Sequence, residues 1–213
     1  MKTIFYEKIN VAVGMICMIC VSSVAYSQVQ FAVGLKGGLN FANLDVSSAQ
    51  AAYDNRTGFH GGAFALFKFT KIAVQPEIIF SQQGSKVTIN TTDYDANFSY
   101  MNIPILLKLY TVAGINLQLG PQFGFLTSAE SDYNPITMQP ESGADISDAY
   151  KNSDVSLGMG VGWDLPFGLT IDARYNLGLT EIDNSANIQA TKNQVWQISA
   201  GYKLIKLGGG KKK

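Results

Sequence analysis

The side chains that could carry out acid–base or nucleophilic chemistry are few in this chain. His60 is the only histidine, and the strand pattern described below puts Ser81 and Glu77 on the same face as His60, on a neighbouring strand. A serine, a histidine and a carboxylate are the components of a hydrolytic triad. Serine is common, however, and nothing in the sequence marks Ser81 as an activated nucleophile. The sequence therefore favours a protein that is not an enzyme.

A larger set of charged and titratable residues shares that face and forms our candidate site. It consists of Lys36, His60, Lys68, Glu77, Lys108, Asp154, Asp172, Arg174 and Lys203. Both signs of charge are present, so these residues can pair, whereas an unpaired buried charge would be costly. The favoured interpretation is a structural network that fills the interior of a closed sheet. The alternative is an ion pathway or a ligand site.

Thiol and metal chemistry have little support. Both cysteines, Cys17 and Cys20, lie in an apolar N-terminal stretch that follows Lys2 and Lys8. We interpret residues 1–27 as a secretory signal peptide that ends in a small-x-small cleavage motif. The mature chain would then hold no cysteine and one histidine, so we expect no disulfide, no soft-metal site and no cofactor.

The elements that position these residues are eight segments that alternate between apolar and polar residues. They cover residues 31–41, 59–69, 72–80, 101–109, 115–125, 155–163, 169–177 and 196–204. A period of two indicates β-strands. One face of every segment lacks charge, whereas the other carries the candidate site and many glycines, which suits lipid outside and a crowded lumen inside. We predict an all-β fold: an eight-stranded antiparallel up-and-down transmembrane β-barrel.

The connections between these segments differ in length. Residues 70–71, 110–114 and 164–168 are short turns, whereas residues 42–58, 81–100, 126–154 and 178–195 are long and polar. Short turns at one end and long loops at the other are typical of outer-membrane barrels. The long loops are rich in acids, which indicates ordinary solvated loops or, alternatively, divalent-cation bridging to lipopolysaccharide phosphates. Pro76 and Pro121 each lack a ladder donor, so we expect them at bulges or strand ends.

The overall charge excludes one class of partner. The chain has 16 basic and 16 acidic residues, so its net charge gives no reason to expect nucleic-acid binding. We assign residues 28–207 to the barrel domain. Residues 208–213, a glycine and lysine run, are predicted to be a flexible basic tail.

Several short motifs resemble one family. They are Gly58-Phe59-His60-Gly61-Gly62, Val74-Gln75-Pro76-Glu77-Ile78, Met101-Asn102-Ile103-Pro104 and Ala173-Arg174-Tyr175-Asn176-Leu177-Gly178-Leu179. Their order and spacing resemble the PorT-like outer-membrane β-barrel family. The resemblance implies an eight-stranded barrel in the outer membrane of Gram-negative bacteria, and one member of the family serves type IX secretion and gliding. Leu66 departs from the pattern, because an acidic inward residue is expected there.

We therefore expect an outer-membrane protein whose surface loops carry a structural, adhesive or secretion-machinery-associated role. The expected partners are outer-membrane lipid and lipopolysaccharide, the barrel-assembly machinery and an envelope or secretion-complex protein, and we expect a monomer. Two alternatives stay open: an outer-membrane enzyme acting on lipid or peptide at the barrel rim, and a soluble periplasmic β-barrel carrier.

Overall fold

A computed structural model describes residues 29–46, 53–89, 92–134, 137, 139–180 and 191–208. The predicted signal peptide and all but the first residue of the predicted tail lie outside these residues. Among the described residues, no helix is long and apolar enough to cross a membrane.

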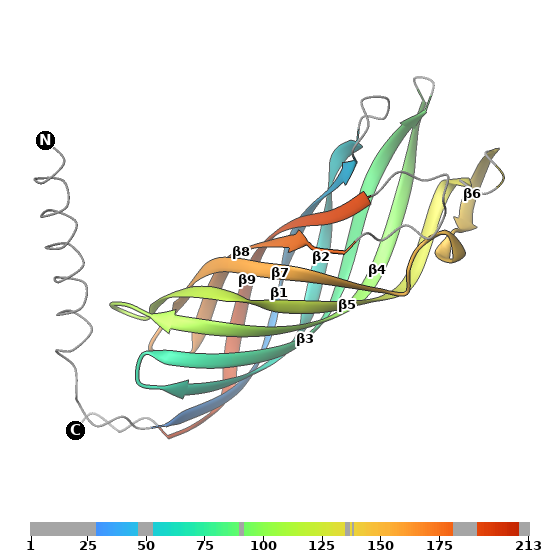
Figure 1. Ribbon diagram of the computed structural model, residues 1–213. Coiled ribbons are helices and arrows are strands. Elements are labelled where there is room, and N and C mark those ends of the chain that lie inside the picture. The colour runs from blue at the N-terminus through green and yellow to red at the C-terminus, as the bar shows by residue number, and fades with distance from the viewer. Residues whose placement is uncertain are drawn as a thin grey trace, which may run out of the picture.

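The described chain is almost entirely antiparallel β-sheet (Figure 1). Its elements are β1 (Gln30–Val46), β2 (Tyr53–Phe69), β3 (Ile72–Ile89), β4 (Thr92–Tyr110), β5 (Ile115–Asn134), β6 (Gln139–Asp145), the 3-10 helix η1 (Ser147–Ala149), β7 (Ser153–Asp164), β8 (Leu169–Gly178) and β9 (Thr191–Leu207). Eight strands are hydrogen-bonded in the order β4-β3-β2-β1-β9-β8-β7-β5, and β5 pairs back with β4. The predicted ring of eight antiparallel strands is confirmed, and β6 is an additional strand that pairs with β5.

The two faces of the ring follow the alternation in the sequence. None of the residues on the charge-free face of the eight predicted segments is buried, and most of its large side chains are exposed. Aromatic rings occur toward both ends of this outer wall, for example Phe59 and Phe80 at one end and Phe69 and Trp163 at the other. Such rings favour the two interfaces of a membrane. The outer wall is therefore built to contact lipid.

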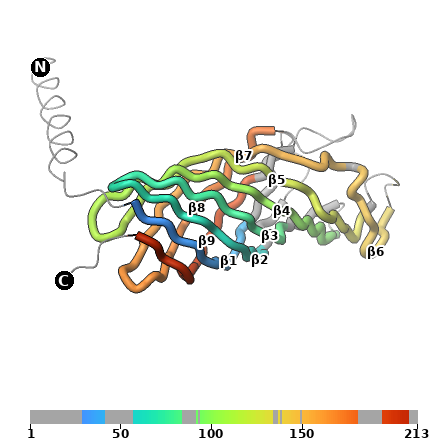
Figure 2. Tube along the Cα trace, turned by 90° about the horizontal axis from the view of Figure 1, so that it is seen from below, coloured from blue at the N-terminus to red at the C-terminus, as the bar shows by residue number. Residues whose placement is uncertain are grey.

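The short turns lie at one end of the barrel together with the first residues of β1 and the last of β9 (Figure 1). The opposite end carries β6 and the far ends of the longest strands (Figure 2). By the usual layout of outer-membrane barrels, the first end is periplasmic and the second extracellular.

The prediction of four long loops is wrong in its bounds, because strands extend into each of the four regions. Residues 42–46, 53–58, 81–89, 92–100, 126–134, 139–145 and 191–195 belong to strands. Beyond the bilayer, water covers the outer face and apolar residues turn inward, so the alternation is inverted. On β4, Ala96, Phe98 and Tyr100 point inward and are buried, whereas Asn97 is exposed. Polar composition was therefore a poor indicator of loop here.

The expectation for the two prolines is also wrong. Pro76 pairs with Ile105 and Pro121 with Leu157, so both lie within strands. Neither adjoins a register shift in those pairings. A proline removes one ladder donor, and the remaining bonds of such long strands hold the register.

Candidate functional site

The centre of the lumen is closed by a buried ion cluster that bridges opposite walls. Arg174 on β8 donates to Glu77 on β3 through two bonds, Nη1 to Oε2 at 3.1 Å and Nη2 to Oε1 at 3.0 Å. β3 and β8 are four strands apart in either direction around the ring. Lys36 on β1 places its Nζ 3.3 Å from both Glu77 Oε1 and Asp172 Oδ2. Two cations and two anions thus pair across the full width of the barrel.

A second cluster lies toward the periplasmic end. Lys203 Nζ is 2.6 Å from Asp164 Oδ2, and the Tyr110 hydroxyl donates to the same oxygen at 2.7 Å. Lys108 Nζ lies 3.6 Å from Asp164 Oδ1 and 3.5 Å from Asp172 Oδ1, which links the two clusters. Lys68 Nζ lies 3.6 Å from the centroid of the Tyr110 ring, a cation–π contact.

Apolar side chains complete this end of the lumen. Ala32, Leu66, Ala73 and Tyr110 form a buried cluster. Leu66 occupies the position where the family resemblance implies an acid, and it is 0% exposed. Packing takes the place of an additional ion pair there, because Leu66, the two alanines and the Tyr110 ring exclude water without the cost of desolvating another charge.

A neutral polar layer lies on the extracellular side of the central ions. His60 Nδ1 is 2.8 Å from Asn40 Oδ1, and His60 Nε2 is 2.8 Å from Ser199 Oγ. Asn40 Oδ1 also accepts from Gln197 Nε2, so it acts as an acceptor toward His60, whose Nδ1 then carries the proton. The structure therefore does not assemble Ser81, His60 and Glu77 into the hydrolytic triad considered from the sequence.

The nine predicted residues thus divide into groups. Seven take part in the contacts above: Lys36, Lys68, Glu77, Lys108, Asp172, Arg174 and Lys203. His60 belongs to the neutral layer. Asp154 lies apart at the extracellular mouth, where it is buried beside a cavity of about 10 Å³ with Gln83, Asn102 and Ser156. Within the described part of the chain, no group of three or more His, Cys, Asp or Glu side chains is placed to hold a metal ion.

Glycines on the inward face give this network its room. A Cβ added to Gly162 on β7 would lie 2.3 Å from Gln118 Nε2 and 2.5 Å from Asp172 Oδ1. Gln118 Nε2 itself donates to Asp172 Oδ1 and to Asn116 Oδ1. Side chains from the neighbouring strands β5 and β8 therefore lie directly on the backbone of β7.

Beyond the extracellular mouth, β4, β5, β6 and η1 form a separate packed unit, here called the surface platform (residues 92–100, 126–134 and 139–150). Its inward side holds a hydrophobic cluster of Ala96, Phe98, Tyr100, Ala129, Ala144 and Ile146, with Leu126 and Tyr150 packed against it. The Phe98 and Tyr150 rings meet edge to face with centroids 4.9 Å apart. These contacts give residues in the predicted loop 126–154 a fixed arrangement.

Polar contacts hold the turn regions of the surface platform. Asp132 Oδ1 accepts from Ser142 Oγ and from the Gly143 N–H, both at 3.1 Å. The Ser147 N–H donates to Asp145 Oδ1 at 2.9 Å, which keeps the pKa of Asp145 below its usual value. β6 also carries Pro140 and a left-handed Gly143, features that protect a strand edge from unwanted pairing.

Sequence reasoning missed several members of the network. Asp164, directly after the predicted strand 155–163, was not among the predicted site residues, yet it contacts three side chains. Asn40, Gln118 and Ser199 are uncharged and were not singled out as site residues. The alternation in the sequence places these three residues on the inward face. Their heights along the barrel depend on the register between strands, which the sequence does not state.

A closed ring of eight strands with a lipid-facing outer wall and an ion-paired lumen defines a transmembrane β-barrel. The model of the outer membrane protein beta-barrel domain family matches residues 26–184, more than half of the chain. The protein belongs to this family and is an outer-membrane protein. The finer PorT-like assignment stays a prediction.

One solved structure supports the fold. Neisserial surface protein A is 12% identical, with 81% of this chain and 97% of that chain covered and a TM-score of 0.52. The chain also matches, at lower TM-scores, Ail of Yersinia pestis in complex with the heparin analogue sucrose octasulfate (17% identity, 86% and 100% covered, TM-score 0.45) and OprG of Pseudomonas aeruginosa (13%, 85% and 96%, TM-score 0.39). No curated protein sequence matches the chain. Identities this low concern the fold alone.

Proposed function

We propose that the protein is a non-conducting, non-catalytic anchor that holds the surface platform at the cell surface for a structural, adhesive or secretion-machinery-associated role. The observation that carries this proposal is the separate hydrophobic cluster of the surface platform. Strands that only cross the bilayer have no need of a second core beyond it. A packed β-unit presents one fixed surface, which lowers the ordering cost of binding a partner.

The closed lumen supports the same proposal. Arg174 and Glu77 join opposite walls, and the side chains of Lys36, Glu77, Asp172 and Arg174 are at most 3% exposed. A barrel of eight strands is just wide enough for side chains to fill. An ion would have to break several charge-assisted hydrogen bonds to pass. The lipid-facing outer wall and the family membership also argue against the soluble periplasmic carrier.

The enzyme alternative now rests on the connected side chains of Ser199, His60 and Asn40, which resemble a Ser-His-Asn relay. Ser199 is 4% exposed and His60 6%, and both face the filled lumen. A substrate carbonyl has no room to approach Ser199 Oγ. The trio fits better as a crosslink between β1, β2 and β9.

We therefore predict that a fluorophosphonate probe does not label the folded barrel at Ser199. The measurement is mass spectrometry of the purified protein after probe treatment, with a Ser199→Ala variant treated in the same way. Covalent labelling that disappears in the Ser199→Ala variant would restore the enzyme hypothesis.

The stability of the surface platform is tested by removing the Phe98 ring from its hydrophobic cluster. Phe98→Ala is expected to favour local opening of the surface platform by about 3 kcal/mol, the low end for a buried Phe truncated to Ala. The check is the rate of limited proteolysis within residues 126–154 of the protein in membranes. Asn97→Ala, an exposed change at the next residue, is the control and should leave that rate unchanged.

Partner binding can be followed on the same variants. A photo-crosslinking residue in place of Gln139, which is exposed on β6, should capture the partner of the surface platform. For a secretion or structural role this partner is an envelope or secretion-complex protein in native membranes, and for an adhesive role it is a ligand on the surface to which the cell adheres. Phe98→Ala should reduce this capture and Asn97→Ala should not. Equal capture by both variants would show that a fixed surface platform is not required.

A further inference from the structure

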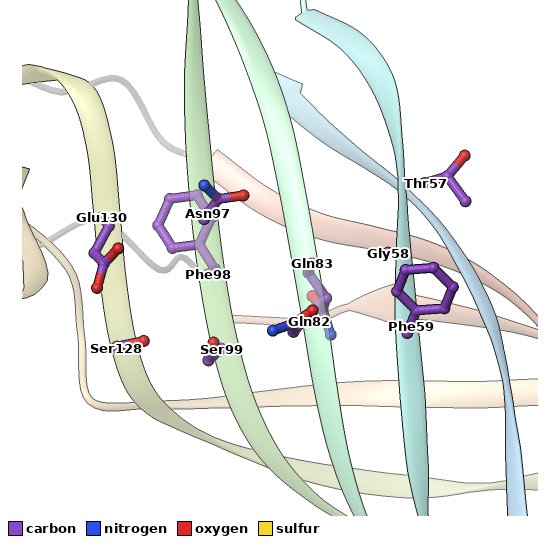
Figure 3. A pocket seen from close by; sticks show the side chains of 10 residues that line it. All are labelled: Thr57, Gly58, Phe59, Gln82, Gln83, Asn97, Phe98, Ser99, Ser128 and Glu130. Carbon is purple, nitrogen blue, oxygen red and sulfur yellow. The ribbon is translucent and has the colours of Figure 1, made fainter. Parts of the chain in front are cut away.

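The outer face of the barrel has a groove where the lipid-facing wall ends. A pocket of about 430 Å³ is lined by residues from four neighbouring strands, β2 to β5 (Figure 3). The lining residues whose side chains point outward and are exposed are Thr57, Phe59, Gln82, Asn97 and Glu130. The pocket is therefore on the outside of the barrel rather than in its lumen.

Two irregularities in the strand pairing flank this groove. The register between β2 and β3 shifts between Asn55 and His60, and that between β4 and β5 shifts between Ser99 and Tyr100. Bulges of this kind bend a sheet and increase its twist, and they are frequent beside functional sites. The outer surface of β3 and β4 thus lies between two bends.

The first bend is held from inside the barrel. Asn40 Nδ2 donates to the carbonyl oxygens of Gln82 at 2.9 Å and of Phe59 at 3.2 Å. A Cβ on Gly58 would lie only 2.1 Å from the Gln82 oxygen, so β2 and β3 approach closely here because residue 58 is glycine. The groove is therefore a built feature of the backbone.

A second, apolar pocket of about 370 Å³ adjoins the first on the membrane side. The two share Phe59, Gln82 and Ser99. The second is also lined by Phe80, and the Phe59 and Phe80 side chains are 63% and 62% exposed. Its floor is thus continuous with the lipid-facing wall, so a hydrocarbon chain can enter it directly from the outer leaflet.

The polar pocket has a distinctive composition. Its outward-facing side chains are two amides, three hydroxyls, one phenyl ring and one carboxylate, with no cation among them, whereas the side chains of Gln83 and Phe98 are buried on the inward face. Asn97 pairs with Glu130 and Ser99 with Ser128 across β4 and β5, which places donors and acceptors side by side. Amides and hydroxyls both donate and accept, as required for sugar hydroxyls. A phosphate head group would instead face the Glu130 carboxylate.

From this composition and its continuity with the lipid interface, we propose that the groove binds an outer-leaflet glycolipid. The uncharged sugar head lies against Gln82, Asn97, Ser128 and Glu130, and an acyl chain lies along Phe59 and Phe80. This binding differs from the partner role of the surface platform: Asn97, Ser128 and Glu130 lie on the outward face of its strands, whereas its hydrophobic cluster lies on the inward face.

The test uses the full-length barrel in nanodiscs of phosphatidylcholine with a minor fraction of galactosyl-diacylglycerol. Native mass spectrometry then counts the lipids retained. We expect the fraction of galactolipid among the retained lipids to exceed its fraction in the nanodisc bilayer. The double variant Asn97→Val with Ser128→Val should lower this enrichment about tenfold to hundredfold, since each of the two lost hydrogen bonds weakens binding about threefold to tenfold. Valine suits a strand, so folding is retained.

The controls separate the parts of the proposal. Ser153→Val, an exposed change on β7 outside both pockets, should retain wild-type enrichment, and Ser99→Trp should abolish it by filling the shared part of the groove. Equal retention of sugar-free diacylglycerol would overturn the role of the sugar. Preferential retention of phosphatidylglycerol would overturn the neutral head group, and equal binding of free galactose would overturn the role of the acyl chain.

Discussion

Glu77→Gln should destabilise the barrel by about 3–5 kcal/mol, the cost of leaving a buried charge without its partner. The glutamine keeps the shape of the side chain but removes the negative charge that faces Arg174 and Lys36. Lys36 retains Asp172 at 3.3 Å, whereas Arg174 keeps at most one of its two bonds to residue 77, because the glutamine amide has one oxygen in place of two. The guanidinium would then be buried in the lumen with only neutral acceptors, the amide oxygens of the new glutamine and of Gln118. Urea unfolding in lipid vesicles, followed by tryptophan fluorescence, measures the change.

The double variant Glu77→Leu with Arg174→Leu distinguishes charge balance from simple packing. It removes one cation and one anion, so the Lys36–Asp172 pair remains neutral overall. We expect it to recover most of the stability lost in Glu77→Gln, because apolar replacement of a complete buried pair is often neutral or stabilising. Glu141→Gln, which removes an exposed acid on β6, is the control. A double variant that is less stable than Glu77→Gln would contradict this account.

The transmembrane part of the fold was predictable because the bilayer imposes a strict rule on each residue. Lipid tolerates no charge on the outer face, so Leu35, Leu117 and Ile198 alternate with Lys36, Gln118 and Ser199. The alternation therefore gives both the strands and the direction of every side chain. The extracellular ends of the strands obey the opposite rule, because water covers their outer face. A pattern of apolar outward residues therefore identifies each strand only as far as the membrane surface.

The pairings inside the lumen were less predictable than its composition. Parity places Glu77 and Arg174 on the inward face but does not state that they lie at the same height on opposite walls. That height follows from the register of the four successive strand pairs between β3 and β8 and from the common tilt of the strands. Asp164 illustrates the same limit, since its contact with Lys203 joins strands that are not neighbours in the ring. The groove depends on two bulges, for which the sequence shows no clear signal.

Gly162→Val should cost about 3 kcal/mol of stability, through overpacking and a displaced ion. The new Cβ would lie 2.5 Å from Asp172 Oδ1 and 2.3 Å from Gln118 Nε2, closer than any real contact of a Cβ. Asp172 cannot yield freely, because its carboxylate lies within 3.5 Å of the ammonium groups of Lys36 and Lys108. The barrel must therefore either break these pairs or bend β7.

The matched control places the same valine on the outer face. A Cβ on Gly61 would meet only the Lys36 oxygen, at 3.8 Å, which is an ordinary contact. Gly61→Val should change stability by less than about 0.5 kcal/mol, because a lipid-facing valine adds apolar surface without displacing any group. The comparison uses urea unfolding of both variants in the same vesicles. Equal stability of the two variants would show that the lumen adapts to an added side chain, and the tightly packed network inferred from Gly162 would then be wrong.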